Sequence, residues 1–397
     1  MSAFTRVLTS TIMLCGVSVS FVFGQGAAMP FRLKLDSAKE IAFAKDYFSV
    51  ELVAGWVSMH SGFVRQLLSS NKKFSIFLSP SLTLFDGTKL EFAQTHSEED
   101  FPSNANFPWG VTSVVLDRLP ADAMPHIGIR LATYREANIG KILAELDKSK
   151  ASLGNLLQGP VPGYVAVVGN VFNALFGLDK TKFPFNWDGD LRTGPFVTAS
   201  SMTEQYVILI APEGTGDSFL RTLNIAKLTF DEQGSRLSYD GKPLVDRSYA
   251  VLKIHKVDPY NIPQLMLDNT APWAVLATNS FLFSLAADAT SKDELSVAAK
   301  NTLAQLTNEI DLLKRERRFS AFSRAQALSA FASLSRDAIK GQCVRLNVVE
   351  TCPTGSIDGL IARVATVFGL PADTSLVNAS EDLKKGLSSL KPSNRIQ

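Results

Sequence analysis

The sequence predicts an α+β protein: an antiparallel β-sandwich with a two-helix insertion, followed by a mainly α-helical C-terminal module. Short β-rich segments separated by turn residues fill 74–135 and 195–258, which is typical of a sandwich or barrel. Apolar residues at helical spacing interrupt them at about 136–180. The run 291–340 then contains neither proline nor glycine, as a long helical segment requires.

We therefore expect three parts along the chain of 397 residues. In order they are a secretory signal at 1–28, a β-sandwich domain at 29–260 and a helical domain at 261–397. Hydrophobic residues make up 46% and charged residues 20% of the chain, as in ordinary globular domains. The formal net charge is only +2, which argues against nucleic acid as a partner.

The first 28 residues follow the order of a secretory signal. Arg6 lies in a short polar start, no residue from Val7 to Gly24 is charged, and small residues follow. Serine and threonine dilute the apolar run, so a permanent span is the weaker interpretation. A lipid-anchored Cys15 is weaker still, because the bulky Leu14 precedes it. We expect a periplasmic or secreted protein, with membrane anchoring by an uncleaved N-terminal segment as the alternative.

The first β region contains several short segments with strand character. Residues 47–57 are rich in strand formers, whereas 61–73 favour a helix. Further along, Ile127, Ile129 and Leu131 alternate, as the buried face of a strand requires.

The helical insertion at about 136–180 is predicted from two segments. Ile139, Ile142, Leu143 and Leu146 have helical spacing, and 164–179 is apolar almost all round. The second segment is too short and too often interrupted to be a membrane span, so we expect it to pack across a sheet.

The second β region begins with its most apolar segment. Residues 205–212 are continuously apolar after the first positions, which predicts a central strand covered on both faces. Residues 226–244 predict a hairpin. A last strand follows, with Ala250, Leu252 and Ile254 on one face.

The C-terminal module begins at a predicted capping box formed by Ser291 and Glu294. Gly341 is the expected helix end, and the run between is either one helix of about 50 residues or two helices joined near 315–320. An apolar stripe along this run indicates contact with another helix. Its members are Leu303, Leu306, Ile310 and Leu313. We expect an intramolecular bundle, with the apolar segment 271–287 as the partner. The alternative is self-association, or contact with a protein partner, through the 291–340 helix.

Cys343 and Cys352 are the only cysteines left after removal of a signal, and in an oxidising compartment two such cysteines usually pair. The intervening residues 344–349 alternate like a strand, which would hold the two cysteines about 30 Å apart. A disulfide needs Cα atoms within about 7 Å. A turn at Asn347 would resolve the conflict, and we favour the disulfide.

One loop has weak calcium character. Asn186, Asp188 and Asp190 alternate as the oxygen ligands of a calcium loop do, but Leu191 and Val197 stand where such a loop needs glycine and glutamate. Acidic residues from another loop could complete a Ca²⁺ site. These are Glu98, Glu99 and Asp100. Ordinary turn chemistry explains the same residues and is the favoured interpretation, so we expect no cofactor, with Ca²⁺ as the weak alternative.

The sequence contains no HExxH, CxxC, GxSxG or Walker A motif. We therefore expect no catalytic residues and an exported, non-catalytic protein that binds or scaffolds a ligand that the sequence does not identify. The alternative is a secreted hydrolase whose site is assembled from distant residues, with His126 or His255 as the base.

Overall fold

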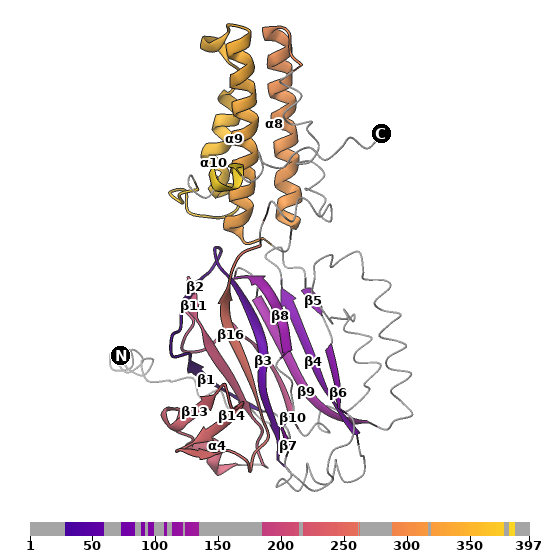
Figure 1. Cartoon of the computed structure of the whole chain (residues 1–397), viewed down its shortest axis with the longest axis vertical. Helices are drawn as coiled ribbons and strands as arrows, with labels where there is room; N and C mark the ends of the chain where they lie inside the picture. Colours follow the sequence, from indigo (N-terminus) through magenta and orange to yellow (C-terminus); the bar gives the residue numbers. More distant parts are fainter. Residues whose placement is uncertain are drawn as a thin grey trace, which may run out of the picture.

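The computed structural model describes most of the two predicted modules. The described residues are 28–58, 73–83, 89–91, 94–98, 107–108, 113–121, 124–134, 185–213, 217–260, 262, 288–316, 319–376 and 381–385. The predicted signal, the two-helix insertion, the segment 271–287 and nearly all of the predicted helix at 61–73 lie outside these residues. The α+β class is confirmed, with antiparallel sheets followed by helices (Figure 1).

The largest sheet has six antiparallel strands, and its core strands come from both ends of the β region. Its order is β1 (Met29–Lys34), β12 (Gln205–Ile210), β16 (Tyr249–Val257), β3 (Tyr47–Val57) and β7 (Phe107–Pro108), with β8 (Ser113–Pro120) also paired to β3. The sequence interpretation began the sandwich strands at residue 74. That start is wrong, because β1 and β3 precede residue 74 and pair with β12 and β16.

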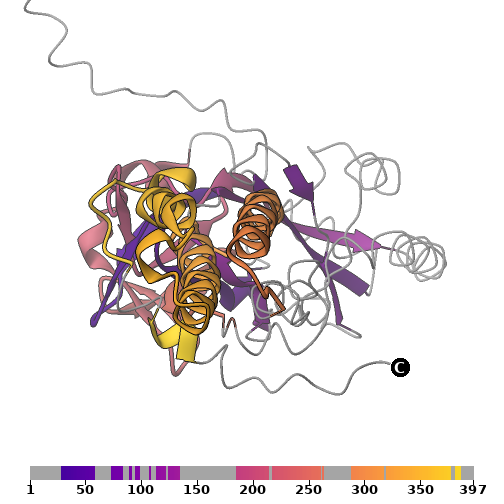
Figure 2. The same cartoon turned by 90° about the horizontal axis from the view of Figure 1, so that it is seen from above.

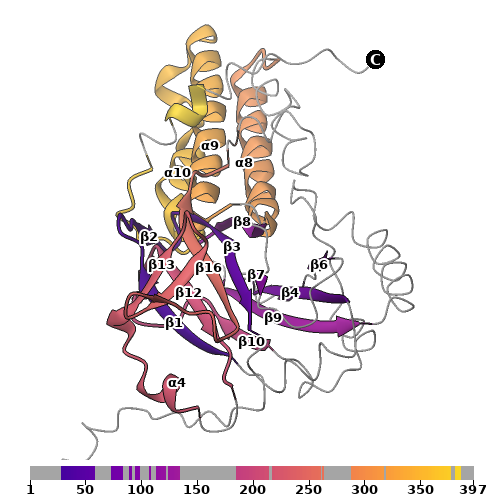
Figure 3. The ribbon, with the colours of Figure 1, turned by 60° about the horizontal axis from the view of Figure 1, so that its bottom comes forward.

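A second sheet of five strands crosses the first. Its order is β10 (Phe185–Asp190), β9 (Met124–Tyr134), β4 (Lys73–Thr83) and β5 (Lys89–Glu91), with β6 (Gln94–Glu98) also paired to β4. Figure 3 shows β9 running across the direction of β3, as in sheets packed at a steep angle. Two small sheets complete the β part. They are β2 (Glu40–Ala42) with β11 (Ser201–Thr203), and β13 (Leu228–Asp231) with β14 (Arg236–Tyr239) and β15 (Lys242–Pro243).

Both faces of the six-stranded sheet are covered, which confirms the prediction of a buried central strand. On β12, Val207 and Leu209 face one core, which also receives Leu191 from the end of β10. Ile208 and Ile210 face the other core. The predicted hairpin is present as β13 and β14. It covers that second face together with the short helix α4 (Ser218–Thr222), which follows its capping residue, Asp217.

The C-terminal module is a helical bundle that stands at one end of the sheets (Figures 1 and 2). It consists of α8 (Lys292–Arg315), α9 (Ala321–Arg345), a short 3₁₀ turn η3 (Val349–Thr351) and α10 (Gly355–Val367). The run is therefore two helices with the break near 315–320. Ser291 caps α8 as predicted, but Glu294 binds the backbone N–H of Thr290, one residue earlier than a standard capping box.

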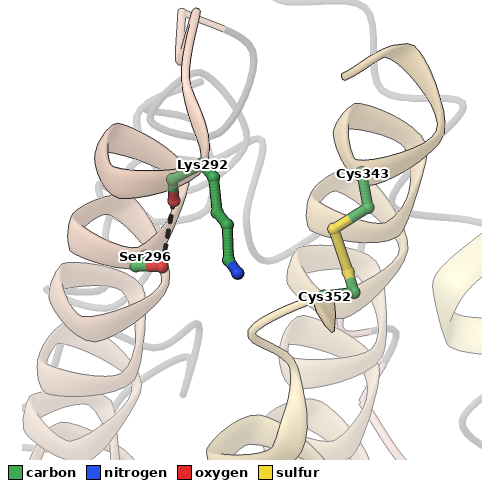
Figure 4. The surroundings of a disulfide bond; sticks show 4 residues. All are labelled: Lys292, Ser296, Cys343 and Cys352. Atoms are coloured by element: carbon green, nitrogen blue, oxygen red, sulfur yellow. Dashed lines mark hydrogen bonds between the residues drawn. A yellow bond between two sulfur atoms is a disulfide. The ribbon is translucent and has the colours of Figure 1, made fainter. Parts of the chain in front are cut away.

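Two predictions at the end of α9 are wrong. The helix continues past Gly341 to Arg345, and 344–349 form no strand. Asn347 adopts a left-handed conformation, φ 55°, and the N–H of Val348 donates to the carbonyl of Cys343, which closes the helix and reverses the chain. This turn brings Cys352 back to Cys343, with the Cα atoms 5.7 Å apart and the sulfurs 2.06 Å apart (Figure 4). The predicted disulfide is confirmed.

The bundle joins the sheets through a polar junction at the start of α9. The hydroxyl of Tyr47 on β3 accepts a hydrogen bond from the N–H of Ser320, at 2.8 Å, and donates to the hydroxyl of Ser323, at 2.9 Å. The N–H of Phe322 donates to the carbonyl of Ala44. Because Ser320 is the N-cap of α9, the first turn of this helix is held directly by the β part.

Among the residues that the structure describes, no helix combines the length and apolar character needed to cross a bilayer.

Candidate functional site

The outer face of the six-stranded sheet changes from apolar to polar toward the helical bundle. Near β13 and β14 this face carries Tyr249 and Val251, which are buried. Further along β16 the same face carries Lys253 and His255, and the opposite residues on β3 are Glu51 and Ser49. Because side chains alternate between faces along a strand, these four polar residues share one face. They define the polar patch.

Ser49 is the most buried member of the patch, with only 2% of its surface exposed. Its hydroxyl donates to the Oδ1 atom of Asp117, at 3.0 Å, and accepts from the backbone N–H of Arg118, at 2.9 Å. Both of these neighbours belong to β8, where its pairing with β3 is irregular. Arg118 has a positive φ of 49°, a strained conformation for arginine that this irregularity maintains.

His255 lies opposite Ser49 on the neighbouring strand and close to Glu51. Its Nε2 atom is 3.8 Å from Oε1 of Glu51, which is close enough for an ion pair when the imidazole is protonated. Its Nδ1 atom is buried and has no hydrogen-bond partner. Since His255 and Glu51 each keep 23% of the side chain exposed, the patch is open to solvent at this point.

Residues of β12 and of the β13–β14 hairpin extend the polar patch. Glu232, in the turn between β13 and β14, accepts hydrogen bonds from Lys253 and from the hydroxyl of Tyr206 on β12, the latter at 2.6 Å. Burial favours a higher pKa for Glu232, but these two hydrogen bonds outweigh it and hold the pKa below the usual value. Burial, together with the bond to Glu232, raises the pKa of Tyr206. Glu232 is therefore anionic and Tyr206 neutral near pH 7.

The contacts of Ser49 differ from those of a serine nucleophile. A nucleophilic serine needs a base that takes its proton, most often an imidazole within hydrogen-bond reach. In this patch the hydroxyl proton of Ser49 goes to Asp117, and the Arg118 N–H occupies the hydroxyl oxygen. The exposed members of the patch can instead contact a ligand through charge and hydrogen bonds.

The predicted calcium residues are not all brought together. Asp190 on β10 lies opposite His126 of β9. Glu98 lies opposite Phe74 of β4 and belongs to β6, which is three strands from β10 across the second sheet, and it is about 20 Å away along the strands. Asp188 is on β10, opposite Gly128, but the structure does not describe its side chain. Glu99 and Asp100 lie outside the described residues. Among the described residues there is no group of three or more His, Cys, Asp or Glu that could hold a metal ion.

Asp190 itself performs the ordinary turn chemistry that the sequence favoured. Its Oδ1 atom accepts from the N–H of Arg192, at 2.7 Å, and its carbonyl accepts from the side chains of Thr193 and Arg32. The guanidinium of Arg32, 7% exposed, also binds the carbonyl of Leu191 and the side chain of Gln205. This turn after β10 is therefore fixed from inside the β part.

Sequence reasoning found His255 but missed Ser49, Asp117 and Arg118. The available signal was the alternation of Ser49 and Glu51 with apolar residues in the segment 47–57. This pattern indicates a strand that is polar on one face at this point. Nothing in the sequence around Asp117 and Arg118 indicates their contacts with Ser49, because these contacts depend on the pairing of β8 with β3.

Comparison with known proteins adds no relative: no family model, no curated protein and no solved structure matches this chain.

Proposed function

We propose that this chain is an exported, non-catalytic protein that binds or scaffolds, with the β part as the ligand-binding module and the helical bundle as the assembly module. The Cys343–Cys352 disulfide carries the proposal, because such a bond persists in oxidising compartments and is rare in the cytosol. The N-terminal pattern of Arg6 and an uncharged apolar run supports the same location, in the periplasm or outside the cell. An uncleaved N-terminal anchor is the alternative location.

The export part is tested on protein produced in a secreting host. We expect the intact mass to correspond to cleavage between Gly24 and Met29, and non-reducing peptide mapping to recover the two cysteines in one linked peptide pair. A mass that includes Met1 to Gly24 would contradict the cleaved signal. Two free thiols in the secreted protein would contradict the disulfide and remove the main support for export.

The assembly part rests on the surface of the 291–340 segment and of the end of α9 that follows it. Val297 on α8 and Val344 on α9 are 56% and 67% exposed, and the antiparallel course of the two helices puts both toward the end of the bundle that lies away from the sheets. We propose that this end contacts a second copy or a protein partner. Light scattering across a concentration series tests self-association. V297D and V344D should lower the mass of any oligomer without unfolding the chain.

A secreted hydrolase is the second candidate. The fold places His255 directly opposite Ser49 and near Glu51, and catalysis would require the Ser49 hydroxyl to leave Asp117 and donate to His255. The test is hydrolysis of a panel of ester and peptide substrates by the purified protein, with S49A and H255A as variants. Activity that both variants abolish while the chain stays folded would establish the hydrolase. Binding that H255A weakens, with no hydrolysis in any sample, supports the binding module.

A further inference from the structure

The buried side of α8 follows the spacing of a helical-bundle seam. Its buried positions recur at alternating intervals of three and four residues, as the core positions of packed helices do. They are Leu295, Ala299, Thr302, Leu306, Glu309 and Leu313, and the one further buried residue of α8, Ala298, lies next to Ala299. Polar residues therefore take two positions of a seam that is otherwise apolar, and one of them is a carboxylic acid.

Glu309 is the least satisfied group in the described part of the bundle. Only 1% of its surface is exposed, and neither carboxyl oxygen has a hydrogen-bond partner. Gln305 lies one turn earlier on the same helix and has an unpartnered Oε1 atom, and the hydroxyls of Thr302 and, on α9, Ser335 are also buried without partners. A buried polar atom without a partner carries a desolvation cost, so this concentration of five in one bundle needs an explanation.

No charged side chain in the described part of the bundle forms an ion pair with Glu309. On α9, the guanidinium of Arg324 binds the carbonyl of Glu316, and Arg336 pairs with Asp337 and with Asp358 of α10. Burial without an opposing cation raises the pKa of Glu309 to about 7.

The amide oxygen of Gln305 also favours the protonated form of Glu309. Apart from the carboxyl itself, the unpartnered buried atoms in the described part of the bundle are the hydroxyls of Thr302 and Ser335, which can donate or accept, and this amide oxygen, which can only accept a hydrogen bond. A protonated Glu309 has a donor to offer this oxygen, which lies one turn away on the same helix. An ionised Glu309 supplies no donor and places a charge beside an acceptor in a desolvated seam.

We propose that Glu309 makes the α8–α9 hairpin a proton-dependent lock, in which the protonated carboxyl holds α8 in the bundle and the ionised carboxylate releases it. This inference goes beyond the proposed binding or scaffolding function and does not depend on export. It gives the assembly module a response to pH in the range around neutrality.

The direction of the effect follows from proton binding. Between the usual glutamate pKa of 4.5 and the folded value of about 7, the folded bundle binds more protons at Glu309 than the unfolded chain. Stability therefore falls as pH rises through this window, and the loss is complete above the folded pKa. For these two pKa values, the equilibrium constant for opening α8 rises on the order of a hundredfold between pH 5 and pH 8.

Hydrogen exchange of the full-length, disulfide-bonded protein, read on α8 peptides and corrected for intrinsic exchange, measures this opening. We expect the wild type to show the rise on the order of a hundredfold from pH 5 to pH 8. E309Q should abolish the pH dependence, because an amide does not titrate. D311N is the matched control, since Asp311 lies on the same helix and is exposed. It should keep the wild-type profile.

Two results would overturn the proposal: a wild-type opening constant that does not change over this range, or an E309Q profile with the wild-type slope. If E309Q does not fold, E309L provides the same comparison, because leucine suits an apolar seam position. E309L should be protected at all pH values, and a retained pH dependence in E309L would again exclude Glu309 as the lock.

Discussion

At the scale of single residues, Tyr47 shows how one side chain joins two modules. Its ring is almost fully buried, and its hydroxyl serves both as acceptor for Ser320 and as donor to Ser323. The sequence identified Tyr47 as part of a strand-rich segment, but its partners lie more than 270 positions away in the chain. Local patterns contain no information on such a contact, so only the folded chain reveals it.

We predict that Y47F weakens the junction between the β part and the bundle. The variant keeps the ring but leaves the N–H of Ser320 without its acceptor in a buried position, which costs about 1–3 kcal/mol. Urea unfolding followed by circular dichroism measures the change. Y239F is the control, because the hydroxyl of Tyr239 contacts an exposed N–H, that of Asn224. Equal stability of Y47F and the wild type would show that the hydroxyl does not support the junction.

At the scale of elements, α8 shows what periodicity predicts and what it misses. The predicted stripe contained Leu306 and Leu313, which are fully buried, and Leu303 and Ile310, which are partly buried against the same core. The intramolecular bundle is thus present, with α9 and α10 forming the described core around α8. The predicted stripe differs from the observed buried seam of α8, because it was chosen from apolar residues alone. Buried positions that hold polar residues, above all Glu309, were therefore missed.

We predict that L306D unfolds the helical module. The change puts a charge at a position that is fully buried between helices, and an unpaired buried charge is among the few substitutions that cost more than about 4 kcal/mol. V297D is the matched control on the same helix, since Val297 is 56% exposed. Far-ultraviolet circular dichroism should show loss of helix for L306D and no loss for V297D. An L306D protein with full helix content and lower oligomer mass would instead place Leu306 at an intermolecular interface.

At the scale of the whole molecule, the β part and the bundle have separate cores, joined by the Tyr47 junction and by Tyr260. The stacking of Arg118 on the ring of Tyr260, 5.0 Å from its centroid, ties the irregular β8 to the same junction. Two separate cores joined at a junction are the arrangement expected of two domains. The boundary between them stays a prediction. It should fall between Asp258 and Ser291, at the polar or proline-containing stretches 258–263, 268–273 and 287–294.

Limited proteolysis tests that boundary. We predict that a protease with broad specificity cuts first between Asp258 and Ser291, because exposed polar linkers are cleaved before folded elements. The N-terminal fragment should keep a β-type circular dichroism spectrum after separation. First cleavage inside the β part would contradict the boundary. Unfolding of the isolated fragment would show that the bundle completes the core of the β part.

The sequence by itself determined the elements whose signals are local. Alternation and continuous apolar character predicted β12 and β16, turn residues predicted the β13–β14 hairpin, and Ser291 marked the start of α8. These signals suffice because strand faces, turns and caps depend on neighbours only a few residues away. The disulfide was also predicted, from the number of cysteines and the expected oxidising compartment, although the strand assigned between the two cysteines was wrong.

Only the tertiary structure decided how distant segments combine. The pairing of β3 with β8 creates the contacts of Ser49 with Asp117 and Arg118, and the packing of α8 in the folded chain buries Glu309. Each depends on contacts between residues far apart in the chain, whose energy comes from burial and pairing that no short window contains. The polar patch and the buried carboxyl are therefore properties of the fold, assembled from residues that look ordinary along the sequence.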